Sequence, residues 1–267
     1  MSKMKRREHY QEGGPSVDFY DLREAGGPGT LLEGDVEFYL AQARRTGGPV
    51  LDLACGTGRV AFPLARAGFD VTGIDRAPGM IAIAREKQQA AGLKNVRFLR
   101  GNMSTFALTR RFGLVVIAYR ALQHLLTAKE QRACLERARR HLRRHGRLVV
   151  HLFDPRLEFC VPSAPPMNRH RSAVHDPASG RDVIVEVLDR QTDPLTQTFS
   201  EIWRWTVSGN GAEPEVVEDV LRLRWTYRYE MRYLLELTGF RVMAEHSDFK
   251  RSAPRYGAEQ VWVAEAD

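Results

Sequence analysis

Ten residues contain the strongest indication of how this chain folds: Val50-Leu51-Asp52-Leu53-Ala54-Cys55-Gly56-Thr57-Gly58-Arg59. The first half is apolar and predicts a short buried strand. Gly56 and Gly58 then allow a tight turn in which the backbone can approach a ligand closely. A helix is predicted from about residue 59 to 67, so its N-terminus opens directly behind the turn. This order of strand, glycine turn and helix is typical of α/β folds that bind nucleotide-like molecules.

The same alternation of strand and helix continues along the chain. Short, continuous apolar runs predict parallel strands that are buried on both faces of a sheet. Such strands are predicted at 49–54, 69–74, 96–99, 112–118 and 147–153. Helices are predicted at 33–45, 59–67 and 78–91, and from a Thr127–Glu130 capping box to about residue 145. We therefore predict a Rossmann-like, doubly wound α/β fold with a mostly parallel seven-stranded sheet.

The pattern changes after residue 154. A Pro-rich connection to residue 177 is followed by longer segments at 181–190, 196–207 and 216–228. In the last of them, two faces alternate: Leu221, Leu223, Trp225 and Tyr227 on one, and Arg222, Arg224, Thr226 and Arg228 on the other. A period of two predicts an antiparallel, half-exposed β insertion. A helix at 230–238 and strands at 241–246 and 260–264 are expected to return to the main sheet.

These patterns divide the chain into four predicted parts. They are a mobile N-terminal arm (1–30), the cofactor-binding core (31–154), an antiparallel β cap (155–228) and the return to the core sheet (229–267). The helix at 33–45 is amphipathic, and we expect Phe38, Leu40 and Ala41 to face inward.

Composition predicts an ordinary globular protein. The chain has 267 residues, of which 43% are hydrophobic and 27% charged. No apolar run is long enough to cross a membrane, and no secretory signal is visible. Three widely spaced cysteines predict reduced thiols and a cytoplasmic location. The net charge of +7 is spread along the chain, which makes nucleic acid an unlikely partner, and no metal-ligand spacing is present.

Two acidic residues indicate the kind of cofactor. Asp75 closes the second strand, where a carboxylate can accept hydrogen bonds from both hydroxyls of a ribose. Asp52 lies just before the glycine turn and would repel the pyrophosphate of a dinucleotide. The same acid suits a cofactor with a cationic sulfonium and an ammonium group, which it can contact directly or through water. Gly56, Gly58 and Ala61 also satisfy the loose dinucleotide fingerprint, so a nicotinamide-dependent oxidoreductase remains an alternative.

The chain resembles the class I S-adenosylmethionine-dependent methyltransferases. Asp52 to Gly58 matches their first motif with Ala54 in place of a glycine, and 73–80 and 100–103 resemble the second and third. The likeness covers about residues 33–154 strongly and 229–267 more weakly. It implies that Asp75 holds the ribose, and that Asn102, which stands where aspartate is commoner, accepts from the adenine amine. The implied binding residues are Tyr20, Asp52, Ala54, Gly56, Thr57, Gly58, Asp75, Arg76, Met80, Asn102, Met103 and Ala118.

Within that superfamily the chain resembles the subgroup that methylates small molecules. The insertion after the fifth strand and the closing Asp248-Phe249 segment carry this likeness, as does Tyr20-Asp21. It implies S-adenosylmethionine as cofactor, a small-molecule acceptor, and methyl transfer to an O or N atom. Tyr20 would then lie near the methionyl end of the cofactor.

Candidate catalytic residues follow the fourth strand. His124 is the candidate general base, because neutral imidazole is abundant near pH 7, although it could instead pack beneath the cofactor. Tyr119 could orient the acceptor or only line the pocket. Arg120 could bind an acidic acceptor or serve a structural role. Methyl transfer needs a base only where the nucleophile does not lose its proton readily.

Three other functions remain open. An RNA or protein methyltransferase fits the same core, although the chain lacks the (Asn/Asp)-Pro-Pro-aromatic run of enzymes that modify base amines. A nicotinamide oxidoreductase is disfavoured by Asp52 and by Asn102-Met103. A non-catalytic cofactor-binding module is the third. The exposed insertion sheet could also pair two subunits into a homodimer.

Overall fold

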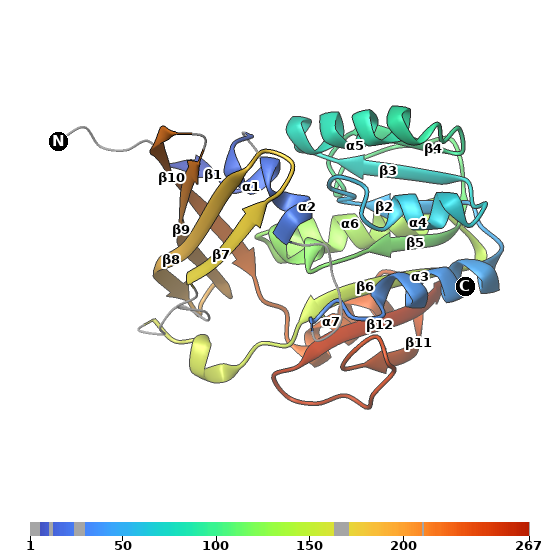
Figure 1. Cartoon of the computed structure of the whole chain (residues 1–267). Helices are drawn as coiled ribbons and strands as arrows, with labels where there is room; N and C mark the ends of the chain where they lie inside the picture. Colours follow the sequence, from blue (N-terminus) through green and yellow to red (C-terminus); the bar gives the residue numbers. More distant parts are fainter. Residues whose placement is uncertain (1–5, 11–12, 24–29, 163–170, 210, 267) are drawn as a thin grey trace. The chain divides into compact units, whose positions relative to one another are not determined.

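The structure is a computed structural model that describes residues 6–10, 13–23, 30–162, 171–209 and 211–266. The chain divides into two compact units, each with a sheet of its own (Figure 1). The core unit lies within Gly26–Pro155 and Trp225–Asp267. The insertion unit lies within Met1–Ala25 and Arg156–Arg224.

The described residues of the core unit form a seven-stranded sheet. In spatial order its strands are β11 (Phe240–His246), β12 (Glu259–Ala266), β6 (Leu142–Phe153), β5 (Phe112–Ile117), β2 (Val50–Leu53), β3 (Val71–Asp75) and β4 (Val96–Arg100). The neighbours from β6 to β4 pair in parallel, whereas β12 is antiparallel to both β6 and β11. The predicted α/β fold with a mostly parallel sheet is therefore confirmed.

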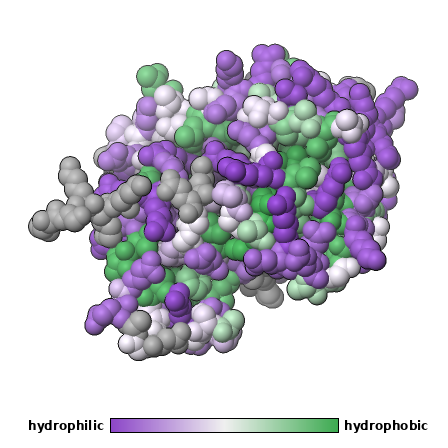
Figure 2. All heavy atoms as spheres, turned by 90° about the horizontal axis from the view of Figure 1, so that it is seen from above, coloured by the Kyte–Doolittle hydropathy of each residue, from purple (hydrophilic) through white to green (hydrophobic). Residues whose placement is uncertain are grey.

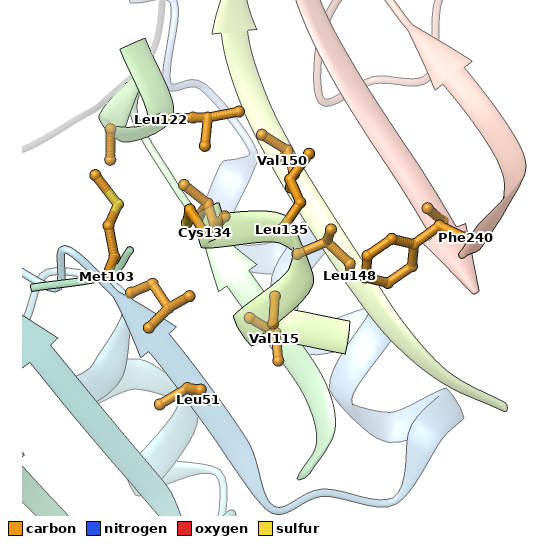
Figure 3. Close-up of a cluster of buried hydrophobic side chains, with 14 of the residues drawn as sticks. Leu51, Met103, Val115, Leu122, Cys134, Leu135, Leu148, Val150 and Phe240 are labelled. Carbon is orange, nitrogen blue, oxygen red and sulfur yellow. The ribbon is translucent and has the colours of Figure 1, made fainter. Parts of the chain in front are cut away.

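Helices cover both faces of this sheet, as a doubly wound fold requires (Figure 1). They are α3 (Asp35–Thr46), α4 (Ala61–Arg66), α5 (Pro78–Ala91), η1 (Ala121–His124), α6 (Ala128–His141) and α7 (Arg228–Leu237). Side chains of α6 and α7, such as Leu135 and Met231, pack on one face of the sheet in a single cluster. Figure 3 shows Leu51 and Leu135 of this cluster. Side chains of α3, α4 and α5 pack on the other face, with Val50 and Val116.

The boundary between α6 and β6 differs from the prediction. Thr127 and Glu130 form the expected capping box at the start of α6. The helix ends at His141, however, rather than near residue 145, and β6 begins at once with Leu142. Leu142 pairs with Phe112 and both side chains are fully buried. This pairing extends the sheet, and burial of Leu142 outweighs the helical preference of the arginine-rich segment that follows.

The insertion unit is the predicted antiparallel sheet. Its described strands, in spatial order, are β1 (Arg7–Glu8), β10 (Ala212–Arg224), β9 (Thr198–Gly209), β8 (Arg181–Asp193) and β7 (Arg171–Asp176). Only the short β1 is parallel to its neighbour. Three short helical segments complete the described part: α1 (Pro15–Asp18), α2 (Tyr20–Arg23) and η2 (Leu157–Phe159).

Three features of this region differ from the sequence-based expectations. β7 lies within the predicted Pro-rich connection. A mobile arm was expected at the N-terminus, but the described residues of this segment form β1, α1 and α2. Side chains such as Val17 and Phe19 are buried there, which accounts for the ordered structure. The expected polar face of 216–228 is partly wrong, since Arg224 and Thr226 are buried. The Arg224 guanidinium donates to Gln197 Oε1 at 3.2 Å, which accounts for its burial.

Other properties concern the described residues as a whole. None of the described helices has the length and apolar character needed to span a membrane. Cys55, Cys134 and Cys160 are buried thiols. Hydrophilic side chains spread over the face seen in Figure 2, with apolar groups between them. No group of described His, Cys, Asp or Glu side chains is arranged to hold a metal ion.

Candidate functional site

The glycine turn follows β2 in the core unit. Its backbone takes left-handed conformations at three residues: Ala54 (φ 56°), Gly56 (φ 55°) and Gly58 (φ 92°). Gly58 is constrained twice, because a Cβ atom there would lie 2.6 Å from a ring carbon of Phe62 and 3.0 Å from Phe98. The turn therefore needs glycine at residue 58 both for its backbone and for close packing.

Asp75 connects this turn to the end of β3. Its Oδ2 accepts the Gly56 backbone N–H at 2.9 Å and its Oδ1 accepts the Ala77 N–H at 2.8 Å. A carboxylate has about four lone-pair positions, and the Arg76 backbone N–H also interacts with this acid, so acceptor capacity remains for a hydroxyl of a bound ribose. Burial raises the pKa of Asp75, although the Ala77 and Gly56 N–H groups oppose that rise. The acid thus holds the turn in shape and can still accept hydrogen bonds.

Asp52 lies one strand away, in β2, opposite Gly73. The side chain is buried, and its Oδ2 has no hydrogen-bond partner among the described residues. Burial raises the pKa of Asp52 to about 7, the positive charge of Arg59 opposes this, and the charge of Asp75 adds to it. A buried carboxylate that titrates near neutral pH is typical of a functional site.

Three residues that the sequence analysis did not select, Arg59, Asp35 and Tyr39, interact electrostatically with Asp52. The Arg59 guanidinium pairs with the Asp35 carboxylate at 2.7 Å and lies 6.0 Å from the centre of the Tyr119 ring. Tyr39 of α3 is fully buried. The predicted inward face of this helix was partly wrong, because Phe38 and Tyr39 are buried whereas Leu40 is only partly so. The spacing of Asp35 and Tyr39, one helical turn apart, is the signal that could have identified them.

The residues expected near adenine lie beyond β3 and β4. Arg76 is exposed, whereas Met80 and Met103 are buried. Asn102 is half-buried, and its Oδ1 accepts both the backbone N–H and the hydroxyl of Ser104, each at 2.9 Å. Both lone pairs of that oxygen are therefore in use, so contact with an adenine amine requires the Ser104 hydroxyl to turn away.

The segment after β5 contains the candidate catalytic residues. Ala118 is buried, and Tyr119 (φ 44°) and Arg120 (φ 62°) both take left-handed conformations that turn the chain into η1. His124 ends η1 and is half-buried. Gln123 anchors this short helix, because its Oε1 accepts the Phe153 N–H of β6 at 3.1 Å. The site residues of the core unit therefore lie at the carboxyl ends of the parallel strands, where α/β sheets bind ligands.

Arg120 is part of an ion-pair network. It donates to the two carboxylate oxygens of Glu259 at 3.2 and 2.5 Å, and Glu259 also interacts with His151 Nε2 at 2.9 Å. Burial acts to raise the pKa of Glu259, but the His151 hydrogen bond and the Arg120 charge outweigh it, and the pKa is lowered. This pairing favours the structural role of Arg120 over the binding of an acidic acceptor.

Tyr20 belongs to the other unit. It lies in α2, where its ring makes an edge-to-face contact with Tyr10, with 5.5 Å between the ring centres. Thr57, another predicted binding residue, lies in the glycine turn of the core unit, where it is buried. The role of Tyr20 at the methionyl end of the cofactor stays a prediction.

Known proteins share this architecture. A family model described as a methyltransferase domain matches residues 50–146, which include the glycine turn, Asp52 and Asp75. A predicted methyltransferase of Geobacillus sp. (strain WCH70) is 29% identical over 246 residues, 91% of this chain and 95% of that protein. The solved structure of the CcbJ methyltransferase from Streptomyces caelestis is similar with a TM-score of 0.73 and 28% identity, and the match covers 97% of this chain and 98% of that one.

A third relative matches only part of the chain. The dTDP-3-amino-3,6-dideoxy-alpha-D-glucopyranose N,N-dimethyltransferase of Streptomyces fradiae is 37% identical over 101 residues, 38% of this chain and 38% of that protein. The fold, the glycine turn and these matches agree. Residues 50–146 belong to the methyltransferase-domain family, and the chain is an S-adenosylmethionine-dependent methyltransferase.

Proposed function

We propose that this methyltransferase transfers the methyl group of S-adenosylmethionine to an O or N atom of a small molecule. The buried Asp52 beside the glycine turn is the observation that carries this proposal. An acid at this position opposes a pyrophosphate and favours a cationic cofactor. Support for a small acceptor comes from the matching segment of the amino-sugar N,N-dimethyltransferase.

The described residues fit this cofactor. Asp75 would accept the ribose hydroxyls through its remaining lone pairs, and Asp52 would accept the methionyl ammonium through its unpartnered Oδ2. When bound, S-adenosylmethionine supplies an activated methyl group on a cationic sulfur. The protein therefore contributes mainly alignment, since reacting atoms held about 3–3.5 Å apart in line can account for much of the rate.

His124 and Tyr119 are the proposed acceptor-side residues of the core unit. Both follow β5, and the Gln123 anchor holds η1 against β6. In this proposal His124 removes the proton of the acceptor, and Tyr119 orients it. The cytoplasmic location and the homodimer stay predictions.

Replacing His124 by alanine tests the base. We expect kcat to fall about 100-fold, the lower range for loss of a general base, while cofactor affinity changes little. Steady-state kinetics and calorimetry measure the two effects. His145→Ala is the control, because the His145 side chain is exposed and its ring lies 3.3 Å from the Glu265 carboxylate. Equal rates for the wild type and His124→Ala would exclude the base role.

Calorimetry tests the cofactor assignment directly. The purified protein is titrated with S-adenosylmethionine, with its demethylated product and with NAD. Micromolar binding of the first two, without NAD, supports the proposal and justifies screening small amines and alcohols as acceptors. Binding of NAD alone would overturn it.

A further inference from the structure

A network of charged side chains lies at the carboxyl edge of the core sheet. Its members, called here the edge network, are Arg120, His151 and Glu259. Arg120 follows β5, His151 lies in β6, and Glu259 is the first residue of β12. Because β12 runs antiparallel to β6, Glu259 pairs with Phe153, the last residue of β6, at the edge where the parallel strands end (Figure 1). Three segments that are distant in the sequence therefore meet here.

Glu259 binds both other members of the edge network. Its Oε1 accepts from Arg120 Nη2 at 2.5 Å, and its Oε2 accepts from Arg120 Nε at 3.2 Å and lies 2.9 Å from His151 Nε2. A two-pronged pair of a guanidinium and a carboxylate fixes direction as well as distance. The lowered pKa of Glu259 keeps its carboxylate ionised near neutral pH, and the His151 side chain is fully buried. The Arg120 guanidinium is therefore held in one position.

Arg120 also has an unusual backbone conformation. Tyr119 (φ 44°) and Arg120 (φ 62°) are consecutive residues other than glycine, and both are left-handed. Such conformations cost free energy and persist only where surrounding contacts hold them. Arg120 is held twice, because its backbone N–H donates to the His151 carbonyl at 3.0 Å while its side chain binds Glu259. The edge network thus stabilises a turn that the local sequence does not favour.

The turn at Arg120 sets the direction of η1. Arg120 is the N-cap of this short helix, and its carbonyl accepts the Gln123 N–H at 3.0 Å. Gln123 Oε1 in turn accepts the Phe153 N–H of β6 at 3.1 Å. η1 ends at His124, so a displacement of Arg120 also moves the start of the helix that carries His124. Glu259 is therefore coupled to His124 through Arg120.

We propose that Glu259 is a positioning residue for methyl transfer, which binds Arg120 and thereby holds segment 119–124 in the conformation in which Tyr119 and His124 meet the acceptor. The inference rests on the proposed function, which assigns acceptor-side roles to those two residues. A buried ion pair is often no more stabilising than apolar residues of similar size, so stability alone is a weak reason for this one. Fixing a strained turn is a stronger reason. Residues 120 and 259 are 139 positions apart, so motif spacing does not connect them.

The chain offers a closely matched pair of variants. Glu259→Gln keeps the size of the side chain but removes the charge that binds Arg120. Glu265→Gln is the control, because Glu265 lies on the same strand, also has a lowered pKa, and contacts Arg241 at 2.8 Å and His145 at 3.3 Å. The two side chains are equally exposed, 14% for Glu259 and 13% for Glu265. Six residues of strand separate them by about 20 Å, so the control lies at the opposite edge of the sheet.

Hydrogen–deuterium exchange of the full chain measures whether Glu259 holds the segment. We expect the backbone N–H groups of Arg120 and Gln123 to exchange at least about tenfold faster in Glu259→Gln, the change that loss of one hydrogen bond to a charged group produces. Exchange in the middle of β6 should stay at the wild-type rate. Glu265→Gln should leave segment 119–124 unchanged. Wild-type exchange of that segment in Glu259→Gln, or equally faster exchange throughout β6, would overturn the inference.

Arg120→Gln tests whether Glu259 acts through Arg120. If it does, Arg120→Gln accelerates exchange of Gln123 about as much as Glu259→Gln, and the double variant is no faster than either single variant. Effects that multiply in the double variant would show that Glu259 acts by another route and would overturn the inference. The double variant also leaves neither charge of the pair buried alone, so it remains informative if a single variant fails to fold.

Kinetics connect this positioning to the reaction. With an acceptor from the screen of small amines and alcohols, Glu259→Gln should lower kcat about tenfold or more, because a small displacement of aligned groups is costly. The Kd for S-adenosylmethionine, measured by calorimetry, should change by less than about twofold, since Asp52 and Asp75 stay in place. Faster exchange with unchanged kcat would overturn the role in methyl transfer and leave the proposed function intact. Exchange needs no acceptor, so failure of the proposed function is detected separately, by the absence of cofactor binding in the wild type.

Discussion

Replacing Asp75 by alanine is expected to weaken S-adenosylmethionine binding about 100-fold or more. The substitution removes the proposed acceptor of the ribose hydroxyls, and each hydrogen bond to a charged group contributes about 1.5–3 kcal/mol. It also releases the Gly56 and Ala77 N–H groups, which the carboxylate holds at 2.9 and 2.8 Å. Two such losses correspond to at least a hundredfold change in Kd. Calorimetry of the variant with the cofactor and with its demethylated product measures the effect.

Asp70→Ala is the control for this experiment. Asp70 is another acid near the start of β3, but it is exposed and pairs with Arg110 at 2.6 Å on the surface. Its substitution should leave the affinity unchanged. Asp75→Asn separates the two roles of the acid, because an amide keeps one acceptor oxygen and can hold only part of the turn. Unchanged cofactor affinity in Asp75→Ala would remove the ribose assignment.

The core sheet could be predicted because its signals are local. Each parallel strand is a continuous apolar run between turn residues, and α5 was predicted at its observed bounds, Pro78–Ala91. Proline begins that helix, and Gly92 ends it in a left-handed conformation at φ 63°. The end of α6 was not predictable in the same way. Nothing near Leu142 in the sequence reveals that it pairs with Phe112 and extends β6.

The insertion unit was predicted less completely. β8, β9 and β10 alternate with a period of two and were recognised, but β7 alternates between exposed and half-exposed residues and carries little hydrophobic signal. The N-terminal segment is held by distant residues. His9 is buried and lies 3.4 Å from Asp219 of β10, more than 200 positions later in the sequence. Such a pairing cannot be read from the local pattern around His9.

The candidate site shows the same difference between residues that a local motif identifies and residues that only long-range packing brings together. Asp52, Gly56 and Gly58 lie within one short motif, and Asp75 ends the next strand, so spacing alone selected them. Asp35 and Tyr39 were missed because α3 brings them to Asp52 only in the folded chain. The motif located Asn102, but it could not show that the Asn102 Oδ1 already accepts two hydrogen bonds from Ser104. Motif spacing thus identifies residues, whereas packing decides what their polar atoms can still do.

The second large effect is expected on stability, from Gly58→Ala. The residue has φ 92°, and its new Cβ would lie 2.6 Å from a ring carbon of Phe62 and 3.0 Å from Phe98. Phe62 is buried in the cluster that covers one face of the sheet, so its ring cannot move without further repacking. Backbone strain of about 1–2 kcal/mol adds to overpacking of about 1–3 kcal/mol. The free energy of unfolding should fall by about 3 kcal/mol, measured by urea denaturation.

Gly68→Ala is the control that separates the packing contribution from the backbone strain. Gly68 has nearly the same φ, 89°, but a Cβ there would meet nothing within 4 Å. Its substitution should therefore cost only the backbone term, about 1–2 kcal/mol. Gly58→Ala should in addition lose cofactor affinity, because Phe62 can be accommodated only by a shift of the turn whose Gly56 N–H is held by Asp75. Equal destabilisation of the two variants would show that the turn can relax around Phe62, and the close packing of Gly58 would then not be what requires glycine in this motif.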